Sequence, residues 1–404
     1  MTGITPLRVL MIVHSQFERD ARVRRYAETL AEHGHEVDVV ALTDPAATSA
    51  QEITGLNVIS VPIRRKRSGA LRYILEWLGF ALLAAWKTMW LSRTRRYDVA
   101  HVHNMPNYLV FAALPAKLRG AKVILDIHDL VPEVFGSKFR ITPRHPVMRA
   151  LRLEEKTSCR FADTVIFASE LFRDIALQRE SCSADKSVVV LNTPDPTIFD
   201  AERFPWSGPE GPEEFRVLYV GTVAPRYGLD NAVRAVKLLQ PELPGLRFLI
   251  YPRLDGGEGE SLTQLRDLVH ELDLESVVDF RRPVPLNEMP MVMSRANVGL
   301  YTPRVDMHMD IALSIKVPEL VAMSVPVVTT RTRVMDRYFS PDQVAYFDDG
   351  DVEGCADAIR RLYEHPCEAR EIAHKALRFF DLHRWEIERE RYLGLLSELA
   401  GRSP

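Results

Sequence analysis

The sequence is poor in the residues that build a covalent or metal-bound framework. Its four cysteines, Cys159, Cys182, Cys355 and Cys367, are scattered and form no CxxC pair. This pattern predicts neither a disulfide scaffold nor a structural zinc site, and it favours a reducing compartment. The formal net charge is only -3, which argues against a nucleic-acid partner bound through overall basicity.

The first residues also lack the features of a secretory signal. The segment MTGITPLRVLMIVHS has no basic start followed by an apolar stretch and a small-residue cleavage site. Residues 7–13 instead have the aliphatic character of a buried strand. We therefore expect a cytoplasmic protein.

What the sequence does contain is enough apolar material for two ordinary domains. The chain has 404 residues, 46% of them hydrophobic, and single cores stop growing near roughly 250–300 residues. Short, nearly continuous apolar runs such as RVLMIV, AKVILDI, FRVLYV and VPVV alternate with segments of helical periodicity. Strands buried on both faces read this way, so we expect two doubly wound α/β domains with parallel sheets.

The expected domain bounds follow from a change in composition at residues 205–214. This segment, PWSGPEGPEE, is rich in proline and glycine and is typical of a linker. It separates a first Rossmann-like domain, residues 1–204, from a second, residues 215–375. Residues 368–400 read as helix throughout, and we expect the final segment, residues 376–404, to pack back on the first domain.

Three segments carry chemistry-bearing residues in an order that resembles a known enzyme family. They are DVAHVHNMPNYLVFAALPAKLRGAKVILDIHDLVPE (98–133), YVGTVAPRYGLDNAVRA (219–235) and SIKVPELVAMSVPVV (314–328). Together they resemble the retaining, nucleotide-sugar-dependent glycosyltransferases of family 4, which have the GT-B fold. The resemblance implies two domains facing a cleft, a nucleoside diphosphate-sugar donor, and neither a cofactor nor a required metal.

The pair Lys316 and Glu319 lies one helical turn apart, so both side chains share a helix face. A lysine suits a diphosphate and a carboxylate suits the two ribose hydroxyls. The alternative is an ordinary surface ion pair, worth a few tenths of a kcal/mol. The family resemblance favours the ligand-binding role.

The loop after the strand RVLYV offers further donor-binding candidates. Gly221 lets the backbone approach a phosphate, and Thr222 adds a hydroxyl donor. The family places an arginine and a lysine in this loop where this chain has Thr222 and Tyr227, so we assign the phosphate cation to Arg226. An ordinary turn glycine is the alternative at Gly221.

Two catalytic candidates depend on the resemblance. His128 follows a strand of the first domain, and the family implies that it contacts the donor sugar; a structural histidine is the alternative. The family also carries a glutamate where this chain has Ile311, so neighbouring Asp310 is the substitute acid. Asp306, His308 and Asp310 at a spacing of two would point one way in an extended chain, which leaves a metal site as a minor alternative.

Residues 64–96 form an apolar segment with basic ends. They contain nine Lys or Arg, the single acid Glu76, and Trp77, Trp86 and Trp90. This suits a helix lying on an anionic lipid surface, and a helix packed on its own sheet is the alternative. Lipid contact would place the protein at the inner face of the plasma membrane.

We therefore expect a glycosyltransferase that transfers a sugar from a nucleoside diphosphate-sugar to a hydroxyl of a lipid-linked saccharide used for cell-surface polysaccharide, with retention at the anomeric carbon. Two rivals are a GT-B sugar-nucleotide epimerase and a catalytically silent scaffold that binds nucleotide sugar. Ile311 is the main support for the silent scaffold.

Overall fold

The protein consists of two compact units, each built on one parallel sheet. The computed structural model describes residues 6–43, 53–63, 70–208, 214–253 and 259–401. Unit 1 comprises residues 1–192 and 388–404, and unit 2 comprises residues 193–387. The predicted linker, residues 205–214, lies partly outside the described residues.

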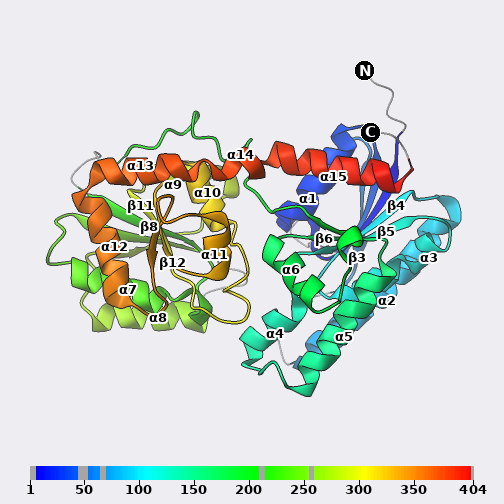
Figure 1. Cartoon of the computed structure of the whole chain (residues 1–404), viewed down its shortest axis with the longest axis horizontal. Helices are drawn as coiled ribbons and strands as arrows, with labels where there is room; N and C mark the ends of the chain where they lie inside the picture. Colours follow the sequence, from blue (N-terminus) through cyan, green and yellow to red (C-terminus); the bar gives the residue numbers. More distant parts are fainter. Residues whose placement is uncertain (1–5, 44–52, 64–69, 209–213, 254–258, 402–404) are drawn as a thin grey trace. The chain divides into compact units, whose positions relative to one another are not determined.

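Unit 1 holds a sheet that has seven strands within the described residues (Figure 1). The order is β3-β2-β1-β4-β5-β6-β7, and every pair is parallel. The strands are β1 (Arg8–Gln16), β2 (Glu36–Leu42), β3 (Leu56–Val61), β4 (Val99–His103), β5 (Lys122–Ile127), β6 (Thr164–Phe167) and β7 (Ser187–Val189). The chain reverses direction across the sheet between β1 and β4, which is where such folds bind ligands at the carboxyl ends of the strands.

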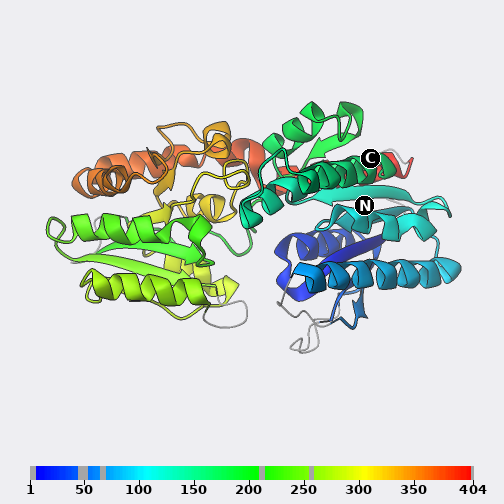
Figure 2. The same ribbon diagram turned by 90° about the horizontal axis from the view of Figure 1, so that it is seen from below.

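The helices of unit 1 cover both faces of this sheet (Figure 2). They are η1 (Phe17–Arg19), α1 (Ala21–Glu32), α2 (Ala70–Thr94), η2 (Asn107–Ala113), α3 (Leu114–Lys117), α4 (Val131–Phe139), α5 (Pro146–Phe161), α6 (Glu170–Gln178), η3 (Ala184–Lys186) and most of α15 (Trp385–Leu399). Since helices bury both faces, the strands have few exposed positions; β1, for example, is buried from Val9 through His14.

Unit 2 repeats the design with a six-stranded sheet within the described residues. The order is β10-β9-β8-β11-β12-β13, again all parallel. The strands are β8 (Phe215–Gly221), β9 (Leu246–Pro252), β10 (Val278–Phe280), β11 (Val298–Tyr301), β12 (Val327–Thr330) and β13 (Ala345–Phe347). The helices are η4 (Pro225–Tyr227), α7 (Leu229–Leu239), α8 (Glu260–Glu271), η5 (Leu286–Glu288), α9 (Met289–Met293), α10 (Lys316–Ala322), α11 (Arg333–Tyr338), α12 (Val352–Glu364), α13 (Pro366–Ala376) and α14 (Phe379–His383).

The predicted fold class, two doubly wound α/β domains, is confirmed by these two sheets. The prediction of unbroken helix over residues 368–400 is wrong, because α13, α14 and α15 are separate helices. In the described part of the chain, the last unit boundary falls within α15, so that residues from Glu388 onward belong to unit 1.

Candidate functional site

In unit 2 the end of β8 packs directly against Lys316. Gly221, the last residue of β8, has a φ of +136°, a conformation that favours glycine. A Cβ built on Gly221 would lie 2.0 Å from Cε of Lys316 and 2.7 Å from its Nζ. A side chain at this position would be strained by the positive φ and would displace the end of the Lys316 side chain.

The ammonium group of Lys316 lies among three tyrosine rings. Its Nζ is 4.1 Å from the ring centroid of Tyr227 and 5.7 Å from those of Tyr219 and Tyr301. Burial lowers the pKa of Lys316 to about 8; the nearby cation of Arg226 also lowers it, while the carboxylate of Glu319 opposes the change. An anionic ligand would reverse the effect of burial, because it would stabilise the protonated amine.

The structure brings most of the predicted donor-binding residues to this point. Arg226, in η4, and Glu319, on α10, both interact electrostatically with Lys316. The side chain of Arg226 is exposed and lies 5.2 Å from the ring centroid of Tyr227. Thr222 accepts a hydrogen bond from the Tyr219 hydroxyl at its backbone oxygen, at 2.7 Å. Lys316 and Arg226 thus provide two cations, and Glu319 one acid, near the glycine that ends β8.

Sequence reasoning missed a further cation and the tyrosines at this site. Arg253 follows β9, donates its backbone N–H to the Gly221 carbonyl at 3.0 Å, and lowers the pKa of Lys316 together with burial. The sequence could have indicated Arg253, because it directly follows the strand LRFLIYP and ligands bind at the carboxyl ends of such strands. The three tyrosines come from β8, η4 and β11, and no periodicity in the sequence relates them.

Asp310, the predicted catalytic acid, is engaged by the start of α11. Its Oδ2 lies 2.6 Å from Nε of Arg333, and its Oδ1 accepts the backbone N–H of Arg333 at 2.9 Å. Neighbouring Ile311 is fully buried. The aliphatic residue at the family's glutamate position is therefore part of the packed interior, which a glutamate could enter only by burying its charge.

The segment 306–311 is a turn, so the expectation of an extended chain with three aligned ligands is wrong. The Asp306 carboxylate accepts the backbone N–H groups of His308 and Met309, both at 2.8 Å. Asp306 therefore caps this turn. Asp306, His308 and Asp310 are not among the convergent metal-ligand groups of the described residues.

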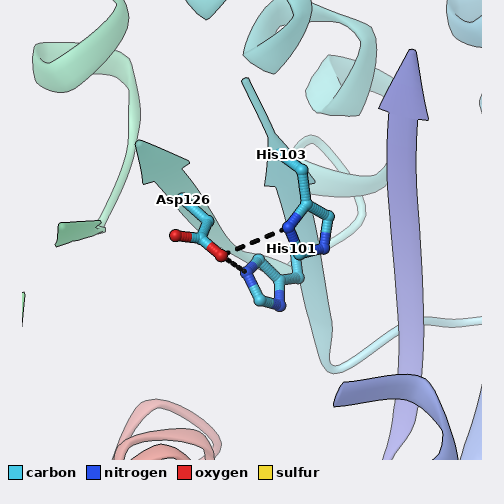
Figure 3. Close-up of side chains that lie close together, drawn as sticks. All are labelled: His101, His103 and Asp126. Atoms are coloured by element: carbon cyan, nitrogen blue, oxygen red, sulfur yellow. Dashed lines mark ion pairs between the residues drawn. The ribbon is translucent and has the colours of Figure 1, made fainter. Parts of the chain in front are cut away.

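Unit 1 contains a second polar cluster, centred on Asp126 at the carboxyl end of β5 (Figure 3). Arg22 donates hydrogen bonds to both carboxylate oxygens, from Nε to Oδ2 at 3.1 Å and from Nη2 to Oδ1 at 3.0 Å. His103 Nδ1 lies 3.2 Å from Oδ2, and His101 Nε2 lies 3.6 Å from it. The predicted residue His128 adds its Nε2 at 3.1 Å.

The protonation states in this cluster follow from burial and from Arg22. Burial by itself would raise the pKa of Asp126, but the cation of Arg22 and the interactions with the surrounding histidines outweigh it and hold this pKa well below its ordinary value. Burial lowers the pKa of His101, and it lowers that of His103 further, with His101 contributing. Asp126 is thus an anion, and the two buried imidazoles beside it, those of His101 and His103, favour their neutral forms.

The C-terminal helix α15 completes this cluster. The hydroxyl of Tyr392 lies 2.9 Å from Nδ1 of His101, and its ring centroid is 4.2 Å from that of Tyr26. Glu388, one turn earlier, accepts the backbone N–H of Leu191 at 3.0 Å. Residues nearly 300 positions apart in sequence therefore share one polar core.

His101, His103 and Asp126 are the one group of convergent metal ligands found among the described residues. Two imidazoles and a carboxylate would suit zinc. However, Arg22 already occupies both carboxylate oxygens, and a divalent ion there would lie beside a buried guanidinium. The residues present therefore fit an arginine-neutralised carboxylate better than they fit a metal centre.

Helix α2 has one buried face and one exposed apolar face. Phe80 and Ala84 are fully buried, whereas Leu82, Trp86 and Trp90 are 73%, 57% and 59% exposed. Trp77 is buried beside His14, at 6.2 Å between ring centroids, so its predicted place at a lipid surface is wrong. The basic start of the segment, residues 64–67, lies outside the described residues.

The acid within this segment does not interrupt the exposed face. The side chain of Glu76 is only 8% exposed, and its Oε1 lies 3.6 Å from Nε2 of His14. In the described part of the chain, we find no helix with the length and apolar character needed to span a bilayer.

Both halves of the chain match the sequence models of known glycosyltransferase domains. The sequence model of the "Glycosyl transferase 4-like domain" matches residues 20–193, and that of "Glycosyl transferases group 1" matches residues 200–378. Sucrose-phosphate synthase from Thermosynechococcus elongatus is similar in structure, with 19% identity, a TM-score of 0.75, and coverage of 98% of this chain and 99% of that chain.

Two other solved structures show the same fold. Anabaena HepE in complex with UDP-glucose has 13% identity, a TM-score of 0.68, and coverage of 97% of this chain and 100% of that chain. A trehalose-phosphate synthase from Burkholderia xenovorans in complex with glucose-6-phosphate has 13% identity, a TM-score of 0.71, and coverage of 96% and 100%. Since the two matched domains together make up most of the chain, in the order and fold of these enzymes, this protein is a glycosyltransferase of the GT-B fold and fits family 4.

Proposed function

We propose that this enzyme transfers a sugar from a nucleoside diphosphate-sugar to a hydroxyl group of a lipid-linked saccharide, with retention of the anomeric configuration. The observation that carries the proposal is Lys316, a partly buried cation that packs on the glycine turn at the end of β8. A cation that burial disfavours is well placed for a ligand that brings two negative phosphates.

In this proposal the residues around Lys316 divide the donor between them. Lys316 and Arg226 stabilise the diphosphate as it leaves, together with the backbone amides after Gly221. Glu319 accepts the ribose hydroxyls. The departing phosphate takes the acceptor proton while the sugar passes through an oxocarbenium-like state, which gives retention without a protein nucleophile. The complexes of Anabaena HepE with UDP and UDP-glucose support this class of donor.

The donor is tested by titrating UDP-, GDP- and dTDP-sugars in a thermal-shift assay. A ligand that binds only the native state raises its apparent stability by mass action, so one nucleotide should raise the melting temperature and the others should not. At the same ligand concentration Lys316→Met should reduce the shift, because it weakens binding, whereas Lys237→Met, on α7, should leave it intact. Incubation of donor alone provides a second readout, since epimerised donor without acceptor would contradict transfer.

The exposed face of α2 supports a lipid-bound acceptor. Leu82, Trp86 and Trp90 recur at helical spacing, and the exposed arginines 93 and 96 follow them at the end of the helix. Apolar and aromatic side chains next to cations suit the surface of an anionic bilayer. This arrangement would hold the enzyme at the cytoplasmic face of the membrane, where a lipid-linked acceptor for polysaccharide synthesis is available.

Sedimentation with vesicles tests this part of the proposal. The triple variant Leu82→Ser, Trp86→Ser, Trp90→Ser should lose binding to vesicles that contain anionic lipid. Leu238→Ser, which alters a leucine 40% exposed on α7 in unit 2, is the matched control and should bind as the parent does. Equal binding by the triple variant would remove α2 from the proposal.

A further inference from the structure

One oxygen atom, Oδ2 of Asp126, receives an unusual number of nitrogen neighbours. Arg22 Nε and His128 Nε2 each lie 3.1 Å away, His103 Nδ1 lies 3.2 Å away, and His101 Nε2 lies 3.6 Å away. The side chains of Asp126, His101 and His103 are fully buried, whereas that of His128 is 21% exposed. His128 is therefore the one imidazole of these three whose ring reaches the surface.

The distance from Asp126 to His128 decides where the imidazole carries its proton. A bare Nε2 would direct a lone pair at an anionic oxygen 3.1 Å away in a buried site, and the two would repel. A protonated Nε2 donates a hydrogen bond to that oxygen instead. His103 Nδ1 also lies 3.2 Å from Nε2 of His128. It cannot accept a hydrogen bond from that nitrogen while it donates its own proton to Asp126.

We propose that Asp126 is a positioning residue that keeps the proton of neutral His128 on Nε2, so that Nδ1 is presented as a hydrogen-bond acceptor for a hydroxyl of the donor sugar. The second half of this statement rests on the function proposed above. The first half concerns the free enzyme alone. The arrangement follows a general rule, in which a buried carboxylate fixes the tautomer and orientation of a functional imidazole.

The backbone of His128 is held as firmly as its ring. Its N–H donates to Oδ1 of Asn104 at 2.8 Å, and Nδ2 of Asn104 donates to the carbonyl of Asp129 at 2.7 Å. Asn104 is itself fixed by a bond from its Nδ2 to Oδ1 of Asn107, at 2.9 Å. Because both anchors are present, the ring has a defined direction in which Nδ1 points away from Asp126.

The proton position can be read by NMR from protein labelled with ¹⁵N at histidine. The chain has 12 histidines, and the signals of His128 are identified by their loss in His128→Gln. At pH 8.5 we expect a pyrrole-type Nε2 and a pyridine-type Nδ1. The reverse pattern in the parent enzyme would overturn the proposal, and this measurement needs no variant of Asp126.

Removing the carboxylate together with its cation tests whether Asp126 is responsible. The double variant Arg22→Met, Asp126→Leu removes both members of the buried ion pair, so it should be less destabilised than Asp126→Leu alone, which leaves the buried guanidinium without this partner. We expect a mixture of His128 tautomers in the double variant and an unchanged parent pattern in Tyr392→Phe, which alters the same cluster at His101. An unchanged His128 in the folded double variant would overturn the role of Asp126.

Adding donor separates this inference from the proposed function. A shift of the Nδ1 signal on saturation with the nucleotide sugar supports the acceptor role. Donor that binds without moving that signal overturns the acceptor role, and the proton assignment in the free enzyme then stands on the first measurement.

Discussion

The two units place charge at the carboxyl ends of their strands in opposite ways. In unit 1, Asp126 is buried with its counter-ion, Arg22, at 3.0 Å, and three imidazoles complete its surroundings. In unit 2, Lys316 lies among tyrosine rings, and burial together with Arg226 and Arg253 works against its charge. The first charge is neutralised by the protein, whereas the second is best neutralised by a ligand.

The same fold therefore uses a buried charge in two ways: one holds neighbouring side chains in place, and the other is placed to bind a ligand. A buried charge with a bidentate partner holds its neighbours in place and gains little from a ligand. A partly buried cation whose burial outweighs its attraction to Glu319 costs folding energy, and the binding of an anion offsets that cost. We therefore read the Asp126 cluster as support for His128 and the Lys316 cluster as the diphosphate site.

The largest expected effect comes from breaking the neutralised pair of unit 1. Arg22→Met leaves Asp126 buried without its cation, which should lower the free energy of unfolding by about 3–5 kcal/mol. Arg24→Met, on the same helix, removes an exposed arginine that pairs with Glu28 at 2.6 Å, and it should cost only about 0.3–0.5 kcal/mol. Urea denaturation of both variants measures the contrast. Similar losses would show that burial of Asp126 does not set the difference.

Introducing a buried acid into unit 2 should be nearly as damaging. Ile311→Glu restores the family's residue at a fully buried position, so we expect it to cost several kcal/mol. Ile311→Val, the control, should cost about 0.5–1.5 kcal/mol. Thermal unfolding compares the two variants. A stable Ile311→Glu enzyme with higher transferase activity would mean that this position can still hold a catalytic acid.

Removing the cation of unit 2 should affect binding and spare stability. Folding lowers the pKa of Lys316 to about 8, so the fold disfavours the charged form, and Lys316→Met should be at least as stable as the parent at pH 7. The loss of a charged hydrogen bond, about 1.5–3 kcal/mol, should weaken binding of nucleoside diphosphate by roughly 10- to 100-fold. Calorimetric titration gives the affinity, and unweakened binding would exclude Lys316 from the phosphate site.

The smallest effect is a pH dependence of the same binding. In the free enzyme Lys316 loses its proton near pH 8, and a bound diphosphate raises its pKa. Affinity should therefore be full below pH 8 and fall as pH rises through 8, by at most about tenfold per pH unit. Titrations at pH 7 and pH 9 measure the change. Lys316→Met should show a flat profile over this range, and a parent profile just as flat would contradict the assignment.

The sequence predicted the sheets well because parallel strands buried on both faces are apolar throughout. Runs such as RVLMIV and FRVLYV became β1 and β8. The strands β7 and β13 were not predicted, since each has only three residues. The break between α14 and α15 was missed because the residues around Arg384 have ordinary helix propensity.

At the candidate site, the sequence predicted residues that stand at the ends of recognisable strands and helices. Gly221 and Lys316 are nearly a hundred positions apart, yet each stands at a recognisable strand end or helix start. Trp77 was misplaced because the apolar run around it does not reveal which face of α2 is buried. The three tyrosines around Lys316 were not predicted, because they come from three separate elements that meet only in the folded unit.

The contribution of α15 to unit 1 has a consequence for the order in which the chain matures. Tyr392 reaches His101 from the last helix, so unit 1 is discontinuous, while unit 2 uses a single uninterrupted stretch. During synthesis all of unit 2 is made before the last segment of unit 1, which begins at Glu388. Unit 1 therefore lacks part of its polar core until α15 is made, and a polypeptide stopped before residue 388 would leave His101 without its contact to Tyr392.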